Sequence, residues 1–518
     1  MAIPDAAARK PALSLWLLAA FALAIVWRAW FIANLPMLSR DGVDYIDYAQ
    51  RLQARGIAAV RDADFEQHPL FPATIAIVQP LLRAVAGVDS PLVWQRSGQF
   101  ESLLCGGVVL LLIAALARRV VAALELPFPP DRVAAIAVLL GGILPLNVWL
   151  SADVMSEQLF LVFYLGACLA MCRAGVLPGL FTGLLAGAAF LTRPEAIALL
   201  PGVAAVAAHG WTRGRRGRAF ATAALALLGF GMVAAPYWGT LGRFSPKAEK
   251  QTVSDSASAQ QPPISYARLD RSEVSMIVAP WHALLETARA GRVAIVALAI
   301  PVLVSLRPAI LRSPLIALAV VALVHFAMIA LLRYRHGYLS PRHALVIVEL
   351  LIPLAAIALA YLATLKPRWL GPLVMLAASA PLAFYATRFP DEQNRHLLPA
   401  AQWVRATAIG GDRVSLLGPR SHSRLAFYAD ARFVLWHDEA ATMAERLAVL
   451  RETALRERVA LISLELGPTG RENHERAGNA EMLVQLSADG ISGAPLEVIY
   501  DQSTSDGARI VILEPRWN

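Results

Sequence analysis

Two carboxylates near the N-terminus stand out in a chain that is otherwise strongly apolar. Asp41 and Asp44 lie in the run Ser39-Arg40-Asp41-Gly42-Val43-Asp44-Tyr45, just after the first hydrophobic stretch. Carboxylates beside a membrane surface are placed to take a proton, to pair with a cation or to bind a ligand. Asp41 could instead cap a helix, with Asp44 in its first turn, where the helix dipole favours negative charge. The residues alone leave both interpretations open.

A second acidic pair, Asp153 and Glu157, lies in the segment Ser151-Ala152-Asp153-Val154-Met155-Ser156-Glu157. Residues four positions apart share a face of a helix, so the two carboxylates could meet one substrate. The alternative is that they only begin a helix, because acidic side chains are favourable near its N-terminus. We expect both carboxylates to contact the active site.

A cluster of cationic side chains occurs much later, between residues 333 and 343. The guanidinium of arginine is a planar fork that matches the oxygens of a phosphate group. Anchoring to anionic lipid headgroups is the alternative, and Arg333 could merely extend its charge to the interface. Arg342 and His343, at the expected start of a helix, are the best placed for a phosphate. The expected substrate-binding residues are Arg333, Arg335, His336, Tyr338, Arg342 and His343.

Three further polar residues lie among apolar segments. His68 opens the run His68-Pro69-Leu70-Phe71-Pro72, and Arg193 and Glu195 are separated by one proline. Charged groups in such surroundings are costly unless they pair or serve a function. We expect all three to bind substrate, with His68 directed toward the acceptor or toward Asp41. The alternatives are a turn residue for His68 and a structural pair at a hairpin tip for Arg193 and Glu195.

The chain offers little else for covalent or metal chemistry. Its three cysteines, Cys105, Cys168 and Cys172, fall within hydrophobic stretches, so neither a disulfide framework nor a Cys-x-x-Cys metal site is indicated. His325 lies alone within a hydrophobic stretch, which is typical of a core histidine. We therefore expect no cofactor and no metal site built from these residues.

The elements that must position these residues are membrane-spanning helices. The 518 residues are 57% hydrophobic and only 16% charged, which excludes an ordinary soluble protein. Apolar stretches of roughly 18 or more residues recur, each long enough to cross a bilayer as a helix. Gly179, Gly183 and Gly187 recur at every fourth position, which predicts close helix packing. The eleven expected spans lie near residues 13–33, 98–117, 133–150, 155–172, 177–192, 195–209, 219–240, 289–306, 314–332, 344–364 and 369–387.

Basic residues give these spans a direction. Arg9 and Lys10 place the N-terminus in the cytoplasm, and counting spans then places the arginine-rich loops on the same side. This pattern accounts for the net charge of +9 without a nucleic-acid partner. Residues 69–87 are apolar enough to cross, but counting them would invert every later loop, so we expect them to lie along the outer surface. The segments expected on the outer face are 34–97, 151–154, 241–288, 333–343 and the C-terminal tail.

A change of composition late in the chain predicts two domains. Residues 1–389 form a transmembrane domain, in which 34–97 is the first outer loop and 241–288 is a mobile loop. Residues 390–518 predict an α/β domain outside the membrane, because a charged helical stretch at 439–458 lies among short strand-like runs. The strand candidates are 414–417, 433–435, 460–464, 496–500 and 510–513.

The order of these motifs resembles the GT-C membrane glycosyltransferases, specifically the branch that contains protein O-mannosyltransferases and aminoarabinose transferases (glycosyltransferase family 39). The likeness rests on Arg40-Asp41-Gly42, on His68-Pro69-Leu70-Phe71-Pro72 and on Ser151–Glu157, all on one predicted side of the membrane, and it covers roughly residues 10–390. The sequence departs from the pattern at one point. Many relatives carry an Asp-Glu pair in the first loop, whereas Asp41 is followed here by glycine.

The resemblance implies an inverting transfer of a sugar from a polyprenyl-phosphate carrier to a lipid, glycan or protein acceptor. Asp41 would be the base, because its Arg-Asp-Gly context is the nearer match, and Asp44 is the alternative. Fixed cations would balance the charge of the departing lipid phosphate. The implied location is a bacterial inner membrane, with an undecaprenyl-linked donor and with residues 390–518 in the periplasm. Some GT-C enzymes of other branches use a divalent ion, which leaves a metal requirement open.

Two other classes fit the same composition. A transporter or lipid flippase often shows two similar halves with matching broken helices, but the sequence has no such repeat and its acids cluster in predicted outer loops. A membrane-anchored binding protein would not need eleven spans. Convergence of Asp41, Asp153 and residues 333–343 on one cavity would favour transfer chemistry, whereas a central pore would favour transport.

Overall fold

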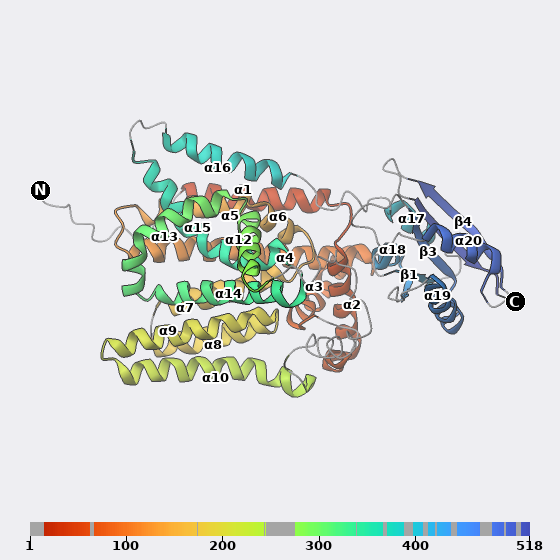
Figure 1. Ribbon diagram of the computed structural model, residues 1–518, viewed down its shortest axis with the longest axis horizontal. Helices are drawn as coiled ribbons and strands as arrows, with labels where there is room; N and C mark the ends of the chain where they lie inside the picture. The colour runs from red at the N-terminus through yellow and green to blue at the C-terminus, as the bar shows by residue number, and fades with distance from the viewer. Residues whose placement is uncertain are drawn as a thin grey trace, which may run out of the picture.

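The structure is a computed structural model with a long helical body and a smaller α/β domain at one end (Figure 1). Residues 245–274 of the predicted mobile loop at 241–288 lie outside the described residues. The structure describes residues 15–62, 67–173, 175–242, 244, 275–337, 339–365, 370–387, 397–407, 413–419, 422–436, 443–466, 479–491, 494–503 and 509–517.

Long apolar helices lie side by side in the helical body (Figure 1). Each of the eleven predicted spans coincides with a helix or, at 133–150, with a bent pair of helices. Among the described residues, six helices are long and apolar enough to cross a bilayer, or up to seven if the bent pair is one span, so the number of crossings stays a prediction. The polytopic helical architecture is confirmed. The helices are α1 (Leu15–Asn34), α4 (Pro91–Ala123), α5 (Pro130–Ile143), α6 (Pro145–Ala152), α7 (Glu157–Met171), α8 (Val176–Phe190), α9 (Leu199–Thr212), α10 (Arg216–Leu241), α13 (Ala294–Arg312), α14 (Ile316–His336), α15 (Leu345–Leu362) and α16 (Leu370–Ala386).

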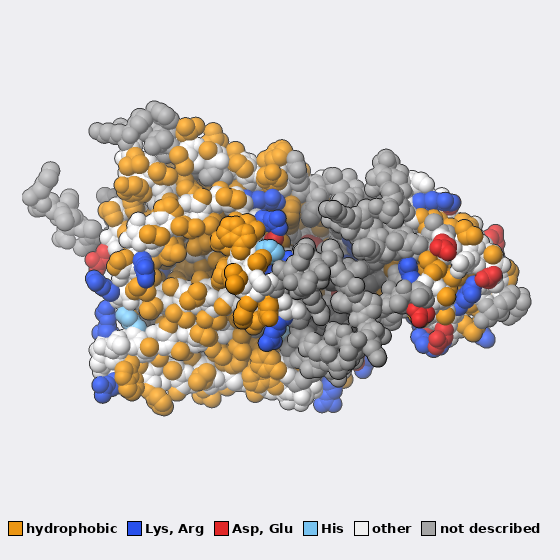
Figure 2. Space-filling model, viewed as in Figure 1, with side chains coloured by type: hydrophobic (Ala, Val, Ile, Leu, Met, Phe, Trp, Pro, Cys, Tyr) orange, Lys and Arg blue, Asp and Glu red, His pale blue; other side chains and the backbone are white. Residues whose placement is uncertain are grey.

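Hydrophobic side chains cover the visible face of this body, and several Lys and Arg side chains lie at the end far from the α/β domain (Figure 2). That distribution is the one expected of a protein that sits in a bilayer. Close packing inside the body depends on the predicted glycine repeat. A Cβ at Gly183 would lie 2.0 Å from the carbonyl oxygen of Ala226 on α10, and one at Gly179 would lie 2.6 Å from that of Thr222. The packing role predicted for these glycines is confirmed.

Two helices, α2 (Arg40–Arg55) and α12 (Val278–Ala290), run across the direction of the long helices (Figure 1). Ser39 caps α2, because its hydroxyl oxygen accepts a hydrogen bond from the backbone N–H of Gly42 at 3.2 Å. The buried residues of α2 include Val43, Ile46 and Ala49, which fall on one helical face. The predicted loop 241–288 therefore ends in a helix, because α12 occupies its last residues.

The short 3₁₀ segment η1 (Gly56–Arg61) follows α2, and α3 (Leu70–Ala86) follows with Pro80 inside it. α3 packs against α2 and α4. At 17 residues it is shorter than a typical span. Its predicted place along the outer surface stays a prediction.

A break between α5 and α6 brings the chain toward the functional region. The two helices meet at an angle of 64°, and Pro145 begins α6 without a backbone N–H to donate. The carbonyls of Gly141 and Gly142 are left without helical partners and accept hydrogen bonds from the buried guanidinium of Arg28 at 3.2 and 3.0 Å. Arg28 also donates to Ser151 of α6 at 3.1 Å. The position of α6 is therefore fixed from within the helical body.

The C-terminal domain holds a five-stranded sheet in the order β2-β1-β3-β5-β4. β1 is parallel to β2 and β3, whereas β5 is antiparallel to β3 and β4. All five predicted strands and the predicted α/β class are confirmed, and α19 matches the predicted charged helix. The elements are α17 (Leu397–Thr407), β1 (Ser415–Gly418), α18 (Ser423–Ala429), β2 (Arg432–Leu435), α19 (Met443–Glu457), β3 (Leu461–Leu466), α20 (Asn479–Asp489), β4 (Leu496–Ser503) and β5 (Arg509–Pro515).

Candidate active site

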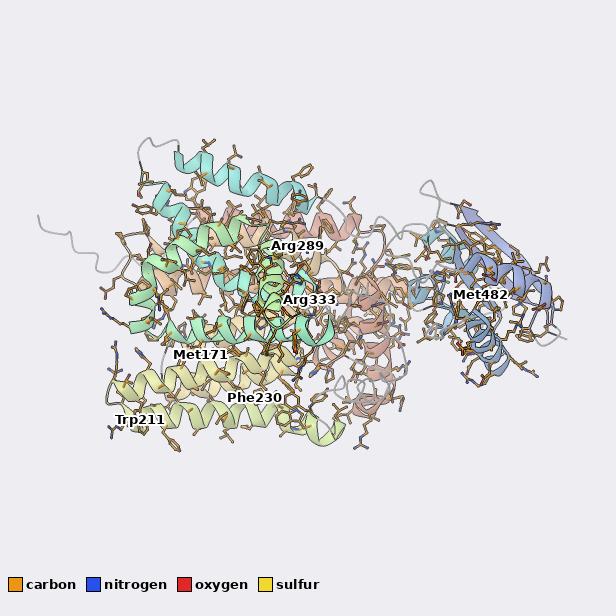
Figure 3. All side chains as sticks on the ribbon, in the orientation of Figure 1. Met171, Trp211, Phe230, Arg289, Arg333 and Met482 are labelled. Atoms are coloured by element: carbon orange, nitrogen blue, oxygen red, sulfur yellow. The ribbon has the colours of Figure 1, made fainter. Side chains whose placement is uncertain are left out.

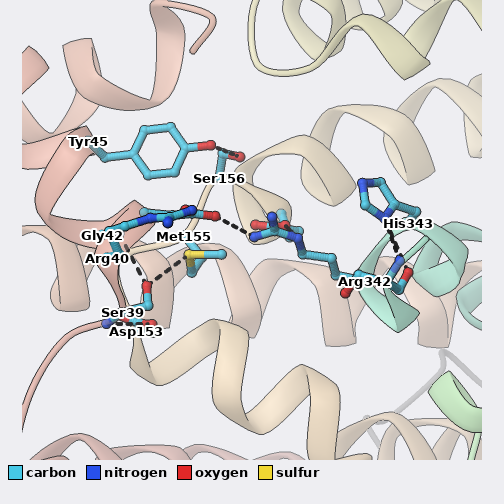
Figure 4. Close-up of polar contacts among 12 residues, drawn as sticks. Ser39, Arg40, Gly42, Tyr45, Asp153, Met155, Ser156, Arg342 and His343 are labelled. Carbon is cyan, nitrogen blue, oxygen red and sulfur yellow. Dashed lines mark hydrogen bonds and ion pairs between the residues drawn. The ribbon is translucent and has the colours of Figure 1, made fainter. Parts of the chain in front are cut away.

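Asp41 lies in the first turn of α2 and pairs with an arginine from a distant part of the sequence. Its Oδ2 atom accepts a hydrogen bond from Nη1 of Arg342 at 2.6 Å, across 301 positions of sequence (Figure 4). Nη2 of Arg40 lies 3.7 Å from the other carboxylate oxygen. The side chains of Asp41 and Arg342 are each 28% exposed, so solvent and ligands can reach them. Because Ser39 is the N-cap, the alternative in which Asp41 only caps the helix is wrong.

A second ion pair lies next to the first. Nη1 of Arg193 is 2.6 Å from Oε1 of Glu157, and Nη2 of Arg193 is 3.2 Å from Oε1 of Glu195. Nε of Arg342 lies 4.0 Å from the same Glu157 oxygen, which links the two pairs. Taking this many charges out of water costs several kcal/mol per ion unless they compensate one another. We call Asp41, Arg342, Glu157, Arg193 and Glu195 the charged cluster.

A small cavity of about 10 Å³ borders the charged cluster, with room for roughly one water molecule. Its lining combines charged and apolar side chains. Within the described part of the chain, Oε2 of Glu157 and Nε of Arg342 are buried and have no hydrogen-bond partner. The charged cluster therefore keeps hydrogen-bonding capacity that the described residues do not use. The cavity is lined by Glu157, Phe160, Leu161, Arg193, Glu195, His325, Arg342, His343, Leu345 and Val346.

His343 shapes the turn that presents Arg342. It lies in the 3₁₀ segment η4 (Pro341–Ala344), where its Nδ1 accepts a hydrogen bond from the backbone N–H of Ser340 at 3.2 Å (Figure 4). This contact is half of a reciprocal capping box. His325 is 1% exposed, and its Nε2 lies 3.0 Å from the carbonyl oxygen of His343. His325 is buried, as predicted for a core histidine, and it also lines the cavity.

Asp153 holds the start of α2 in place. Its two carboxylate oxygens accept hydrogen bonds from the backbone N–H of Ser39 at 3.3 and 3.2 Å, and one of them also accepts from that of Val154 at 2.8 Å. The expectation that Asp153 and Glu157 share a helical face is wrong. Asp153 ends α6 and Glu157 begins α7, because the Asp153 carboxylate binds the backbone N–H of Val154, which a continuous helix would use.

The structure leaves several predicted residues away from the charged cluster. Arg333 is buried on α14 beside α12 (Figure 3), and its Nε donates to Nδ1 of His282 at 2.9 Å. Its Nη1 donates to the carbonyl oxygen of Gly337, which ends the same helix. Arg335 is exposed. The side chain of His336 and all of Tyr338 lie outside the described residues.

His68 and Asp44 have different surroundings. His68 is 3% exposed and packs against the rings of Phe190 and Tyr237, with centroids 5.3 and 5.4 Å away. It thus lies in an aromatic cluster at the end of α8. Asp44 is partly buried on α2, three positions after Asp41 and on the same side of the helix. Both carboxylates of the first motif therefore stay candidates for the base.

Sequence reasoning missed a polar contact between α2 and the start of α7. The hydroxyl of Tyr45 lies 2.8 Å from that of Ser156, next to Glu157. Burial raises the pKa of Tyr45, so its phenol stays neutral at physiological pH. Tyr45 follows Asp41 by four positions, which was the available signal that the two share a face. Among the described residues, no group of three or more His, Cys, Asp or Glu side chains could hold a metal ion.

Comparisons with known proteins connect this geometry to a fold. No protein-family model and no curated protein matches the sequence. ArnT from Cupriavidus metallidurans bound to undecaprenyl phosphate is similar in structure, with a TM-score of 0.61 at 14% identity over 97% of this chain and 98% of that chain. The Archaeoglobus fulgidus oligosaccharyltransferase, in a complex with Zn and sulfate, gives 0.59 at 13% identity over 86% and 67%. The same archaeal enzyme with an inhibitory peptide and a dolichol-phosphate gives 0.54 at 14% over 87% and 69%.

Identities this low show the fold alone. The match to ArnT nevertheless spans nearly the whole of both chains, including the C-terminal domain. The predicted helical fold with its terminal α/β domain is therefore confirmed. The chain has the fold of the GT-C membrane glycosyltransferases.

Proposed function

We propose that the protein is an inverting glycosyltransferase that moves a sugar from a polyprenyl phosphate to a lipid, glycan or protein acceptor. The observation that carries the proposal is the 2.6 Å contact between Asp41 and Arg342 beside the charged cavity. Before the donor binds, this contact holds a carboxylate that can take a proton against a guanidinium that can bind phosphate, and it opens as the sugar enters between them. The similar structures add support, since ArnT was solved with undecaprenyl phosphate and the archaeal enzyme with a dolichol-phosphate.

The chemistry follows from these two groups. Asp41 takes the proton of the acceptor hydroxyl or amine as that atom attacks the anomeric carbon of the donor sugar. The new bond forms on one face of the sugar while the carbon–oxygen bond to the lipid phosphate breaks on the other, which inverts the configuration. The electron pair of that bond stays on the phosphate oxygen. Arg342 stabilises the resulting charge, which is needed because no proton is delivered to the leaving group.

The rest of the charged cluster supports Arg342 and supplies a second cation. Arg193 lies between Glu157 and Glu195, which hold its guanidinium in one orientation. The unpartnered Nε of Arg342 faces Glu157 across 4.0 Å, so a phosphate oxygen could be accepted there with little rearrangement. Asp44 is the alternative base, one helical turn from Asp41. In this proposal Asp153 acts indirectly, by holding the start of α2.

The proposed setting is the outer face of a bacterial inner membrane, with the N-terminus in the cytoplasm and residues 390–518 in the periplasm. The charged cluster lies toward the end of the helical body that meets the C-terminal domain, because α2 carries Asp41 and contacts α18. This position supports the proposed orientation. Several Lys and Arg side chains lie at the opposite end (Figure 2). The positive-inside rule favours the cytoplasm for that end. Residues 1–389 would then form the catalytic unit that receives the lipid-linked donor.

The test is sugar transfer from radiolabelled polyprenyl-phosphate donors in native membranes, comparing the wild-type protein with Asp41→Asn. We expect a loss of roughly 10² to 10⁴-fold in transfer, with donor binding retained. Unchanged transfer in Asp41→Asn with loss in Asp44→Asn would move the base to Asp44. Absence of transfer from every donor in the wild type would overturn the proposal and favour the transport alternative.

A further inference from the structure

Side chains from the two domains interlock where the α/β domain meets the helical body. Met37, in the segment between α1 and α2, is 1% exposed and belongs to a hydrophobic cluster of the C-terminal domain that includes Leu397 and Leu425. Phe427, from α18, packs in the opposite direction into a cluster of the helical body that includes Leu38 and Trp94. Because each domain inserts an apolar side chain into a hydrophobic cluster of the other, the two domains are held against each other.

Tyr428 adds a polar connection at the same place. Its hydroxyl oxygen accepts a hydrogen bond from the backbone N–H of Leu38 at 2.9 Å and donates one to Oε1 of Gln95, on α4, at 3.0 Å. Gln95 is only 3% exposed. One phenol thus joins α18, α4 and the segment that leads into α2. Replacing it with an apolar ring would leave a backbone donor and a buried amide oxygen without this partner.

The backbone group held by Tyr428 is directly next to the one held by Asp153. Leu38 donates to Tyr428, whereas Ser39 donates to Asp153 and caps α2. The start of α2 has no spare room, because a Cβ at Gly42 would lie 3.1 Å from Oδ1 of Asp153. Asp41 lies between Ser39 and Gly42 in this clamped turn. Its direction toward Arg342 therefore depends on two successive anchored amides, one of which is anchored by the C-terminal domain.

We propose that Tyr428 is a positioning residue through which the C-terminal domain holds the Leu38–Ser39 backbone and so aims Asp41 at the donor site. The effect on transfer rests on the proposed function, whereas the anchoring itself does not. Catalytic groups must be held to within roughly half an ångström of the productive geometry, so a small shift of α2 lowers the rate of the chemical step. Binding of the donor, which Asp41 does not hold, stays nearly unchanged.

The experiment compares Tyr428→Phe with Tyr500→Phe, a matched change in the same domain. Tyr500 lies on β4 and packs against Trp403, within the C-terminal domain. Both changes are placed in the full chain that also carries Met37→Cys, and a water-soluble maleimide is used to label the purified protein. The chain without Met37→Cys gives the labelling background of the three native cysteines. Initial rates at varied donor concentration give kcat and KM for the same proteins.

We expect Tyr428→Phe to speed labelling of residue 37 about tenfold and to lower kcat about tenfold, with the donor KM changed less than twofold. Tyr500→Phe should match the parent in the labelling rate of residue 37, in kcat and in the donor KM. Unchanged labelling in Tyr428→Phe would overturn the anchoring, and faster labelling with unchanged kcat would overturn the positioning role. If no donor supports transfer in the wild type, the proposed function and the positioning role fail together, while labelling alone still decides whether Tyr428 anchors the segment.

Discussion

Two arginines in the helical body, Arg28 and Arg342, have contrasting surroundings. Arg28 is 1% exposed and donates to the hydroxyl of Ser151 and to three backbone carbonyls, so it completes a broken helix from within. Arg342 pairs with Asp41, yet its Nε has no hydrogen-bond partner among the described residues and its side chain borders a cavity. An arginine whose donors are used by its own chain serves the fold. One that keeps unused donors at a cavity can serve a ligand.

Of the changes that distinguish Arg342 from Arg28, Arg342→Ala should have the largest effect. We expect transfer to fall by roughly 10³-fold, because the cation nearest the departing phosphate is removed. Thermal stability should fall less than in Arg28→Ala, since the side chain is 28% exposed, Arg40 stays 3.7 Å from Asp41 and Arg193 still pairs with Glu157. Arg342→Lys keeps the charge without the planar fork and should restore part of the rate. Initial rates per folded molecule test this, and a rate within tenfold of wild type for Arg342→Ala would contradict it.

Arg28→Ala should show the reverse pattern. The carbonyl of Gly142 would lose the Arg28 donor and that of Gly141 would keep only the amide of Asn147, at 3.2 Å. The free energy of unfolding should fall by on the order of 3 kcal/mol. Thermal unfolding of the purified protein in detergent measures the loss. Arg28→Lys, which keeps a donor, is the control and should lose less. An unchanged melting temperature for Arg28→Ala would show that the helix break does not depend on this guanidinium.

Gly42→Ala tests how tightly the start of α2 must fit. The added Cβ would lie 3.1 Å from Oδ1 of Asp153 and 3.3 Å from the carbonyl oxygen of Val154, so α2 must shift slightly. We expect transfer to fall about tenfold with little change in donor affinity. Gly217→Ala on α10 is the matched control, because an added Cβ there has no neighbour within 4 Å among the described residues. Equal rates for the two variants would contradict the tight fit of α2.

Removal of divalent metal should have the smallest effect. The charged cluster supplies two arginines for a phosphate, and the described residues offer no group of three metal ligands. We expect transfer in the presence of a chelator to stay within twofold of the untreated rate. The similar archaeal oligosaccharyltransferase was solved with Zn, so a metal requirement is the competing outcome of this measurement. Loss of activity that returns on adding a divalent ion would show that transfer requires a metal.

The sequence predicted the elements well because the relevant signals are local. Each apolar stretch that was predicted as a span coincides with a helix or with the bent pair α5 and α6. Short strand-like runs likewise predicted the five strands of the C-terminal domain. It also identified the acids and arginines of the charged cluster as candidates. Local sequence patterns could not predict how these residues pair, since Asp41 and Arg342 are 301 positions apart and meet only through tertiary packing.

The remaining differences have identifiable physical causes. The break between α6 and α7 depends on Asp153, whose carboxylate binds the backbone N–H of Val154, and periodicity does not reveal such a contact. Arg333 belongs to the same cationic run as Arg342, but the end of α14 directs it to His282. Tyr428 lies in a domain that looked separate, and its contact with Leu38 depends on how the two domains dock. Spacing in the sequence cannot predict contacts that arise from the meeting of two surfaces.

An experimental structure of the full chain with a bound polyprenyl phosphate would test most directly whether the charged cluster is the donor site. We expect the phosphate to lie within hydrogen-bonding distance of the Arg342 guanidinium, next to Asp41. A phosphate bound instead beside Arg333 or Arg335, with the contact between Asp41 and Arg342 undisturbed and no density near the charged cluster, would contradict it.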